Sequence, residues 1–210
     1  MTTTSKQPRS AIESARRTIE LELRAVEQLQ HRIDESFTHA VELLSAVKVR
    51  VIVSGMGKSG HIGNKIAATL ASTGTPAQFV HPAEACHGDM GMITRSDAAL
   101  LMSNSGTTAE ITALLPLLKR LGLPIVAMTG NPDSTLARAA DAHLNISVDE
   151  EACPLDLAPT ASTTANLVMG DALAIAMLEQ SGFTAEDFAF THPGGALGRR
   201  LLTRVSHVLV

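Results

Sequence analysis

The chain has 210 residues, with 17 Lys and Arg against 21 Asp and Glu and a formal net charge of −4. Hydrophobic residues make up 45% and charged residues 18%, which excludes a disordered chain and favours one compact globular domain. With no Trp or Tyr and only five Phe, the chain lacks the aromatic stacking surfaces that bind single-stranded nucleic acid. Together with the mildly acidic charge, this excludes nucleic acid as an expected partner.

Membrane, export and disulfide signals are also missing from the sequence. The longest stretch without a charged side chain, residues 66–83, is interrupted by polar residues, so we expect no membrane partner. The polar residues 1–6 lack the apolar region of a signal peptide and predict a cytoplasmic protein. The two cysteines, Cys86 and Cys153, give neither a disulfide framework nor a four-ligand zinc pattern. We therefore expect free thiols.

The first 48 residues predict a helical arm. From Ser10 to about Val47, apolar residues recur every three or four positions, which is the pattern of an amphipathic helix. Ser10 and Glu13 form a capping box at its start, and the length predicts a break near residues 35–36. Seven basic and seven acidic residues leave this arm uncharged. We interpret it as a packing element and a candidate oligomer interface.

After the arm, short apolar runs alternate with helical patterns. This alternation predicts an α/β fold, a doubly wound, flavodoxin-like sheet of five parallel strands with helices on both faces. The expected strands are 51–53, 77–80, 98–102, 124–128 and 143–146. The expected helices are 60–73, 107–121, 134–140, 160–181 and 194–204.

In such sheets ligands bind beyond the carboxyl ends of the strands, so the turns after the strands are the places to search. The first turn, residues 55–60, has the sequence GMGKSG and fits the dinucleotide pattern G-x-G-x-x-G. A Walker loop is excluded, because Ile52 stands where its first glycine is required. The acidic residue that a dinucleotide site needs is poorly matched by Glu84, which follows Pro82. A nicotinamide-dependent oxidoreductase and a merely tight turn both remain open on this motif alone.

The turn after the third expected strand favours a phosphate site. It places four hydroxyls and a glycine at a helix start, where free N–H groups favour anions. An ordinary helix cap needs only one hydroxyl. With Lys58 on the neighbouring turn, the ligand we expect is a terminal phosphate monoester. The hydroxyl-bearing residues are Ser103, Ser105, Thr107 and Thr108.

Two other stretches are rich in ionisable groups. His81 and His87 flank Cys86, but this spacing matches no dedicated zinc motif. Glu151 follows the fifth expected strand, and a second hydroxyl-rich helix start with Thr160 and Ser162 comes after it. An acidic surface loop followed by a helix cap is the alternative interpretation of this stretch.

Seven motifs in fixed order resemble the sugar isomerase (SIS) domain of D-arabinose 5-phosphate isomerases, over about residues 10–205. They are GMGKSG at 55–60, FVHPAEACHGD at 79–89, SNSG at 103–106, EACP at 151–154, APT at 158–160, GDALA at 170–174 and HPGGALG at 192–198. The resemblance implies a 49–205 sugar-phosphate isomerase domain after the 1–48 arm. It also implies that residues 206–210 begin a linker to cystathionine β-synthase-type modules.

The resemblance implies interconversion of D-ribulose 5-phosphate and D-arabinose 5-phosphate through an enediol, for 3-deoxy-D-manno-octulosonate and lipopolysaccharide synthesis, with no cofactor required. Lys58 would stabilise the enediolate. Glu110 and Glu151 are the candidate bases, and His87 and His192 the candidates for ring opening. We favour Glu151, because Glu110 lies in the first turn of the phosphate helix, whose positive end lowers a carboxyl pKa. The expected substrate-binding residues are Gly57, Ser59, Ser103, Asn104, Ser105, Thr107, Thr108, Thr160 and Ser162.

The expected partners are a phosphosugar and further copies of the chain in a homotetramer, in which His192 reaches a neighbouring sugar site. Excess zinc is expected to inhibit by bridging His81, His87 or His192. Two alternative functions are a non-catalytic sugar-phosphate sensor and an isomerase of another phosphosugar. The uncharged arm disfavours the sensor, because such regulators usually have a basic DNA-binding head.

Overall fold

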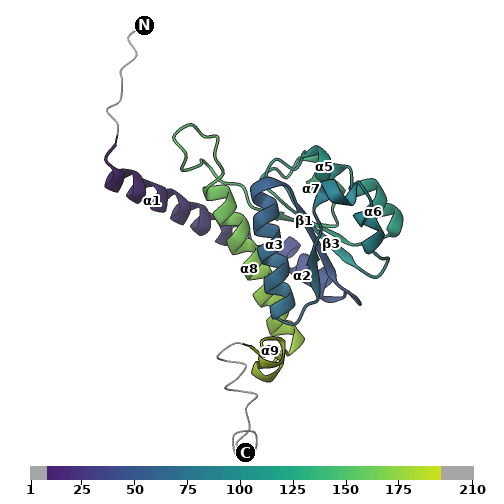
Figure 1. The fold of residues 1–210 in the computed structure, drawn as a ribbon. Helices are drawn as coiled ribbons and strands as arrows, with labels where there is room; N and C mark the ends of the chain where they lie inside the picture. The colour runs from purple at the N-terminus through teal and green to yellow at the C-terminus, as the bar shows by residue number, and fades with distance from the viewer. Residues whose placement is uncertain (1–8, 195–210) are drawn as a thin grey trace, which may run out of the picture.

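The computed structural model describes residues 9–194 and contains a five-stranded sheet in the order β2-β1-β3-β4-β5, with every pair parallel. The predicted flavodoxin-like, doubly wound α/β fold is confirmed (Figure 1). Each expected strand is present within two residues at either end. The strands are β1 Val51–Gly55, β2 Ala77–Phe79, β3 Ala98–Met102, β4 Ile125–Thr129 and β5 Ala142–Asn145.

The three central strands are buried at every position, as parallel strands covered on both faces require. Side chains that alternate along a strand enter two separate cores. Val51 and Val53 pack with residues of α2, α3 and α8, whereas Ile52 packs with residues of α4, α5, α6 and α7. The helices on the first face are α2 Glu35–Ser45, α3 Gly57–Ser72 and α8 Ala161–Ser181. Those on the second face are α4 Pro82–Ala85, α5 Ala109–Thr112, α6 Leu115–Leu121 and α7 Thr135–Ala139.

The helix predicted over 107–121 is wrong as a single element, because it is divided into α5 and α6. Pro116 lies in the first turn of α6. Proline has no N–H to donate to the carbonyl four residues earlier, so the helix breaks and restarts there. The sequence analysis also missed α4, the 3₁₀ helix η1 (Asp89–Met92) and α9 (Ala185–Thr191). The helix predicted over 194–204 lies almost entirely outside the described residues.

The predicted arm contains two helices, α1 (Ala11–Gln30) and α2, and the predicted break is confirmed. Ser10 and Glu13 make the expected capping box, and the Asp34 carboxylate starts α2 by accepting the Ser36 N–H at 2.9 Å. The first half of α1 projects from the body (Figure 1), while α2 is packed into the core through Ala40, Val41 and Leu44. The boundary at residue 48 stays a prediction.

α8 crosses the whole molecule beside α3 (Figure 1). By length and composition it could span a membrane, but half of its apolar window is buried inside the protein. Residues such as Ala165, Met169 and Leu173 belong to the first core cluster. These contacts explain its apolar character as that of a core helix.

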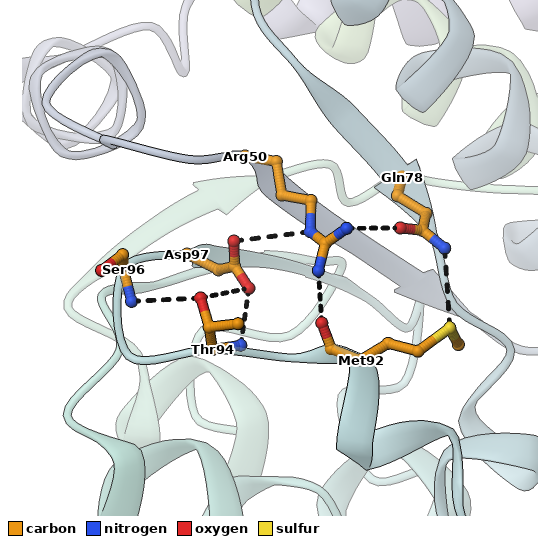
Figure 2. Close-up of polar contacts among 6 residues, drawn as sticks. All are labelled: Arg50, Gln78, Met92, Thr94, Ser96 and Asp97. Atoms are coloured by element: carbon orange, nitrogen blue, oxygen red, sulfur yellow. Dashed lines mark hydrogen bonds and ion pairs between the residues drawn. The ribbon is translucent and has the colours of Figure 1, made fainter.

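A polar cluster joins β1, β2 and β3 at the amino edge of the sheet (Figure 2). Arg50 and Asp97 immediately precede Val51 and Ala98, which are register partners in β1 and β3. Arg50 Nε lies 3.5 Å from Asp97 Oδ1, and the other guanidinium nitrogens donate to Gln78 Oε1 and to the Met92 carbonyl. Asp97 Oδ2 accepts the N–H and hydroxyl of Thr94 at 2.7 and 3.1 Å. The Asp97 side chain is 0% exposed, so Arg50 balances a fully buried carboxylate.

Candidate active site

A cavity of about 520 Å³ lies at the carboxyl edge of the sheet, on the side opposite the Arg50–Asp97 cluster. It is formed by the turns that follow β1 and β3, the segment between β5 and α8, and the first turns of α8. Eight of the predicted site residues line it together: Lys58, Ser59, Ser103, Asn104, Ser105, Thr108, Glu151 and Ser162. The tertiary structure therefore brings the two hydroxyl-rich turns and the Gly-rich turn to one place.

The turn after β3 has the geometry of an anion cradle. Ser103 Oγ accepts the Gly106 N–H at 3.1 Å and lies 2.7 Å from Thr108 Oγ1. Ser105 Oγ accepts the Thr107 N–H and hydroxyl at 3.3 and 3.2 Å. These short side chains converge because Gly106 has φ +65°, and a Cβ there would lie 2.0 Å from Ser134 Oγ. Since α5 has only four residues, the hydroxyls and N–H groups supply the anion site, and the helix dipole adds little.

The Gly-rich turn after β1 serves close packing. A Cβ on Gly60 would lie 2.6 Å from the Gly55 carbonyl oxygen, so α3 approaches β1 only with glycine there. Gly57 begins α3 with φ +58°, a left-handed conformation that L side chains rarely adopt. It does not line the cavity, but it orients the next two residues, Lys58 and Ser59, which do. The glycine spacing is thus explained without a dinucleotide, and Lys58 places a positive charge at the cavity.

Glu151 caps the start of α8 from nine residues upstream. Its Oε2 accepts the N–H and hydroxyl of Thr160 at 2.7 and 2.8 Å and the Ser162 N–H at 3.3 Å. Burial raises the pKa of Glu151, but the hydrogen bonds from Ser162 and Thr160 outweigh it and hold the pKa below the usual glutamate value. Glu151 therefore also lies at a helix N-terminus. The helix-end argument no longer separates it from Glu110, whereas its place in the cavity does.

The remaining predicted residues lie outside the lining of this cavity. Thr107 and Thr160 support it by bonding to Ser105 and Glu151. Glu110 is half-buried in α5, and His81 and His87 are exposed at the start of α4 and just after its end. Among residues 9–194, no group of three His, Cys, Asp or Glu side chains is placed to hold a metal ion. Zinc inhibition through His81, His87 or His192 stays a prediction.

His192 is the predicted site residue whose position differs most from the prediction. It ends α9, which lies at the far end of α8 from the Glu151 segment (Figure 1). Its ring stacks on Phe188 at 4.0 Å, and Nδ1 lies 2.9 Å from the Phe188 carbonyl oxygen. This histidine therefore does not reach the cavity of its own chain.

Sequence reasoning did not predict five polar residues that line the cavity, among them Asp156 and Asn166. Asp156 has φ +53° and accepts the Glu151 N–H at 3.2 Å. Asn166 is 1% exposed on α8; its Nδ2 donates to the Ser162 carbonyl at 2.9 Å, and its Oδ1 has no hydrogen-bond partner among the described residues. A signal for Asn166 existed: it follows Ser162 by four residues on the buried face of α8, and the buried residues after it on that face are Met, Gly, Leu and Ala.

Comparison with known proteins identifies the family. The model of the SIS domain matches residues 43–176. The chain belongs to the SIS domain family. Its cavity, with the hydroxyl turn after β3 and the Gly-rich turn after β1, is accordingly the candidate active site of a SIS domain.

The SIS domain has relatives of high identity. The arabinose 5-phosphate isomerase KdsD of Pseudomonas aeruginosa is 68% identical over 198 residues, which cover 94% of this chain and 61% of that protein. KdsD of Escherichia coli strain K12 is 57% identical over 197 residues, covering 94% and 60%. A solved structure of an E. coli CFT073 protein in complex with arabinose 5-phosphate has a TM-score of 0.84 and 44% identity, covering 87% of this chain and 97% of that one. The chain spans about three fifths of the length of the curated relatives that it matches.

Proposed function

We propose that the chain is an aldose–ketose isomerase that interconverts D-arabinose 5-phosphate and D-ribulose 5-phosphate. The observation on which this depends is that one cavity contains the hydroxyl cradle after β3, the Lys58 ammonium and the Glu151 carboxylate. The cradle suits a non-reacting phosphate, and the other two groups suit proton transfer at the opposite end of a short sugar. The names of the KdsD relatives and the arabinose 5-phosphate complex of the solved neighbour support this substrate.

The reaction requires one proton to move from C2 to C1 and a second to move from the C2 hydroxyl to the C1 oxygen. Glu151 takes the proton from C2 of the open-chain aldose, and the electron pair shifts to give an enediolate across C1 and C2. Lys58 stabilises the negative oxygen of this intermediate. The proton of the C2 hydroxyl passes to the C1 oxygen, Glu151 returns its proton to C1, the carbonyl is left at C2, and the carboxylate is regenerated. Because these steps use only a base and a cation, the mechanism requires no cofactor.

The test is an NMR assay of the purified chain with arabinose 5-phosphate, ribulose 5-phosphate and hexose 6-phosphates. We expect exchange between the two pentose phosphates. Glu151→Gln should lower kcat about a hundredfold or more, because the variant has lost the base. Glu110→Gln, the matched control, should keep most of the activity. Binding of sugar phosphates without turnover would instead support the sensor, and turnover of a hexose phosphate alone would support another isomerase.

The position of His192 supports a homotetramer with shared sites. Since this ring lies at the far end of α8 from its own cavity, a role for it at a sugar site requires the cavity of another copy of the chain. α1 offers a surface for such assembly, because Ile12, Ile19 and Leu23 are about 60% exposed on the face opposite its buried residues. Lys58→Ala chains reassembled with His192→Ala chains should regain activity. Reassembled oligomers that stay inactive would refute sharing.

The finer biological setting follows from the substrate. A sugar phosphate is charged and does not cross a membrane unaided, so we infer cytoplasmic action. The implied role is to supply the pentose phosphate from which 3-deoxy-D-manno-octulosonate is made for lipopolysaccharide. The measurement that tests this role is complementation, by this chain, of a bacterium that lacks its arabinose 5-phosphate isomerases.

A further inference from the structure

One face of α1 contacts the segment that contains Glu151. Arg17 Nη1 donates to the Ala152 carbonyl oxygen at 2.8 Å, and Gln28 Nε2 donates to Asp149 Oδ2. Just after the helix, Arg32 donates to the Ser147 carbonyl. On a helical projection Arg17 and Gln28 lie about 20° apart, next to the buried row of Leu21, Ala25 and Leu29. α1 therefore holds residues 147–152 along their length.

Arg17 acts directly beside the proposed base. Arg17 binds the carbonyl of Ala152, the residue after Glu151. Its Nη2 lies 3.6 Å from the carboxylate of Glu150, the residue before Glu151. The Glu150 side chain is half-exposed, so that ion pair alone is weak. The bond to the carbonyl is partly buried and charge-assisted, and it is the stronger contact.

The same residue, Ala152, is also held by the start of α8. The Ala152 N–H donates to Thr160 Oγ1 at 2.8 Å, and that hydroxyl donates in turn to Glu151 Oε2. Ala152 is thus fixed at its N–H by α8 and at its carbonyl by α1. If the carbonyl contact is lost, the Thr160 contact at the N–H remains, but the backbone is then held on only one side of Ala152.

We propose that Arg17 is a positioning residue for Glu151: by binding the Ala152 carbonyl it fixes the backbone of the residue next to Glu151, and so the direction in which the carboxylate points at the sugar. The proposal rests on the proposed function, in which Glu151 moves the proton. A misplacement of about 1 Å costs about a hundredfold in rate, so we expect kcat to fall about tenfold to a hundredfold without Arg17. KM should change little, because the phosphate contacts lie on a different element, the turn at 103–108.

The experiment compares Arg17→Met with Arg16→Met in the same assay. Methionine keeps the aliphatic stem of Arg17 and removes its donors, and Arg16 is an exposed neighbour on the same helix. We expect Arg17→Met to lower kcat with unchanged KM, Arg16→Met to resemble the wild type, and Arg17→Lys to restore part of kcat through its single ammonium donor. Hydrogen exchange of residues 149–153 should quicken in Arg17→Met, while exchange in β4 should not.

The outcomes separate the two proposals. A wild-type chain inactive on the pentose phosphates refutes the proposed function, and the exchange rates then still report whether Arg17 orders the segment. An active wild type with an unchanged kcat in Arg17→Met refutes the positioning role. A fall in kcat that is accompanied by a loss of phosphate affinity and by a lower melting temperature would also refute it, because such a pattern would indicate that Arg17 only stabilises the fold.

Discussion

The ion pair at the amino edge of the sheet allows a quantitative prediction of stability (Figure 2). Arg50→Met leaves the Asp97 carboxylate, which is 0% exposed, with only the two Thr94 donors on Oδ2. Removing one partner of a buried pair costs about 3–5 kcal/mol of unfolding free energy. For a chain of this size each kcal/mol lowers Tm by about 2–4 °C, so the expected loss is about 6–20 °C.

A double-mutant cycle isolates the charge. Asp97→Asn removes the carboxylate and leaves a buried amide nitrogen, with two N–H groups, without acceptors, at about 1–3 kcal/mol. Arg50→Met combined with Asp97→Asn should therefore unfold at a higher denaturant concentration than Arg50→Met alone, although it has lost more polar atoms. The assay is urea denaturation followed by circular dichroism, with the exposed Arg95→Met as control. The buried-charge reasoning would be refuted if the losses of unfolding free energy in the two single variants add up in the double variant. It would also be refuted by a loss below about 1 kcal/mol in Arg50→Met.

Four further predictions concern the site. Ser105→Ala should mainly raise KM, since it removes a contact to the non-reacting phosphate, whereas Lys58→Ala should mainly lower kcat. Steady-state kinetics measure both constants. If both variants change KM and kcat equally, this division of roles is contradicted. Hydrogen bonds from Ser162 and Thr160 hold the pKa of Glu151 below its usual value. Thr160→Val removes one of them, so it should raise that pKa and move the acid limb of the kcat profile to higher pH. EDTA should leave the rate unchanged, because proton transfer by Glu151 and Lys58 needs no metal, and a loss restored by Mg²⁺ or Zn²⁺ would overturn that mechanism. Excess Zn²⁺ should inhibit, and His87→Ala should weaken this inhibition if His87 is a ligand.

The sequence by itself determined the elements whose interactions are local. The capping box of Ser10 and Glu13 and the hydroxyl turn of Ser103 and Thr108 are formed by residues three to five positions apart, so their spacing predicts them. The strand positions were predictable for a similar reason, since a buried parallel strand is a short run of apolar residues between turn signals. A proline in the expected 107–121 helix also marked the break that we did not predict.

Only the tertiary structure decided which of these pieces meet. Glu151 caps α8 across nine residues, and Arg17 binds the Ala152 carbonyl across 135 positions of the chain. No periodicity encodes such pairs, because they depend on how α1 and α8 pack against the sheet. The same packing buries Asn166 at the cavity and carries His192 away from it. The residue types at the site were therefore visible in the sequence, whereas their distances, their burial and the low pKa of Glu151 exist only once the helices are in place.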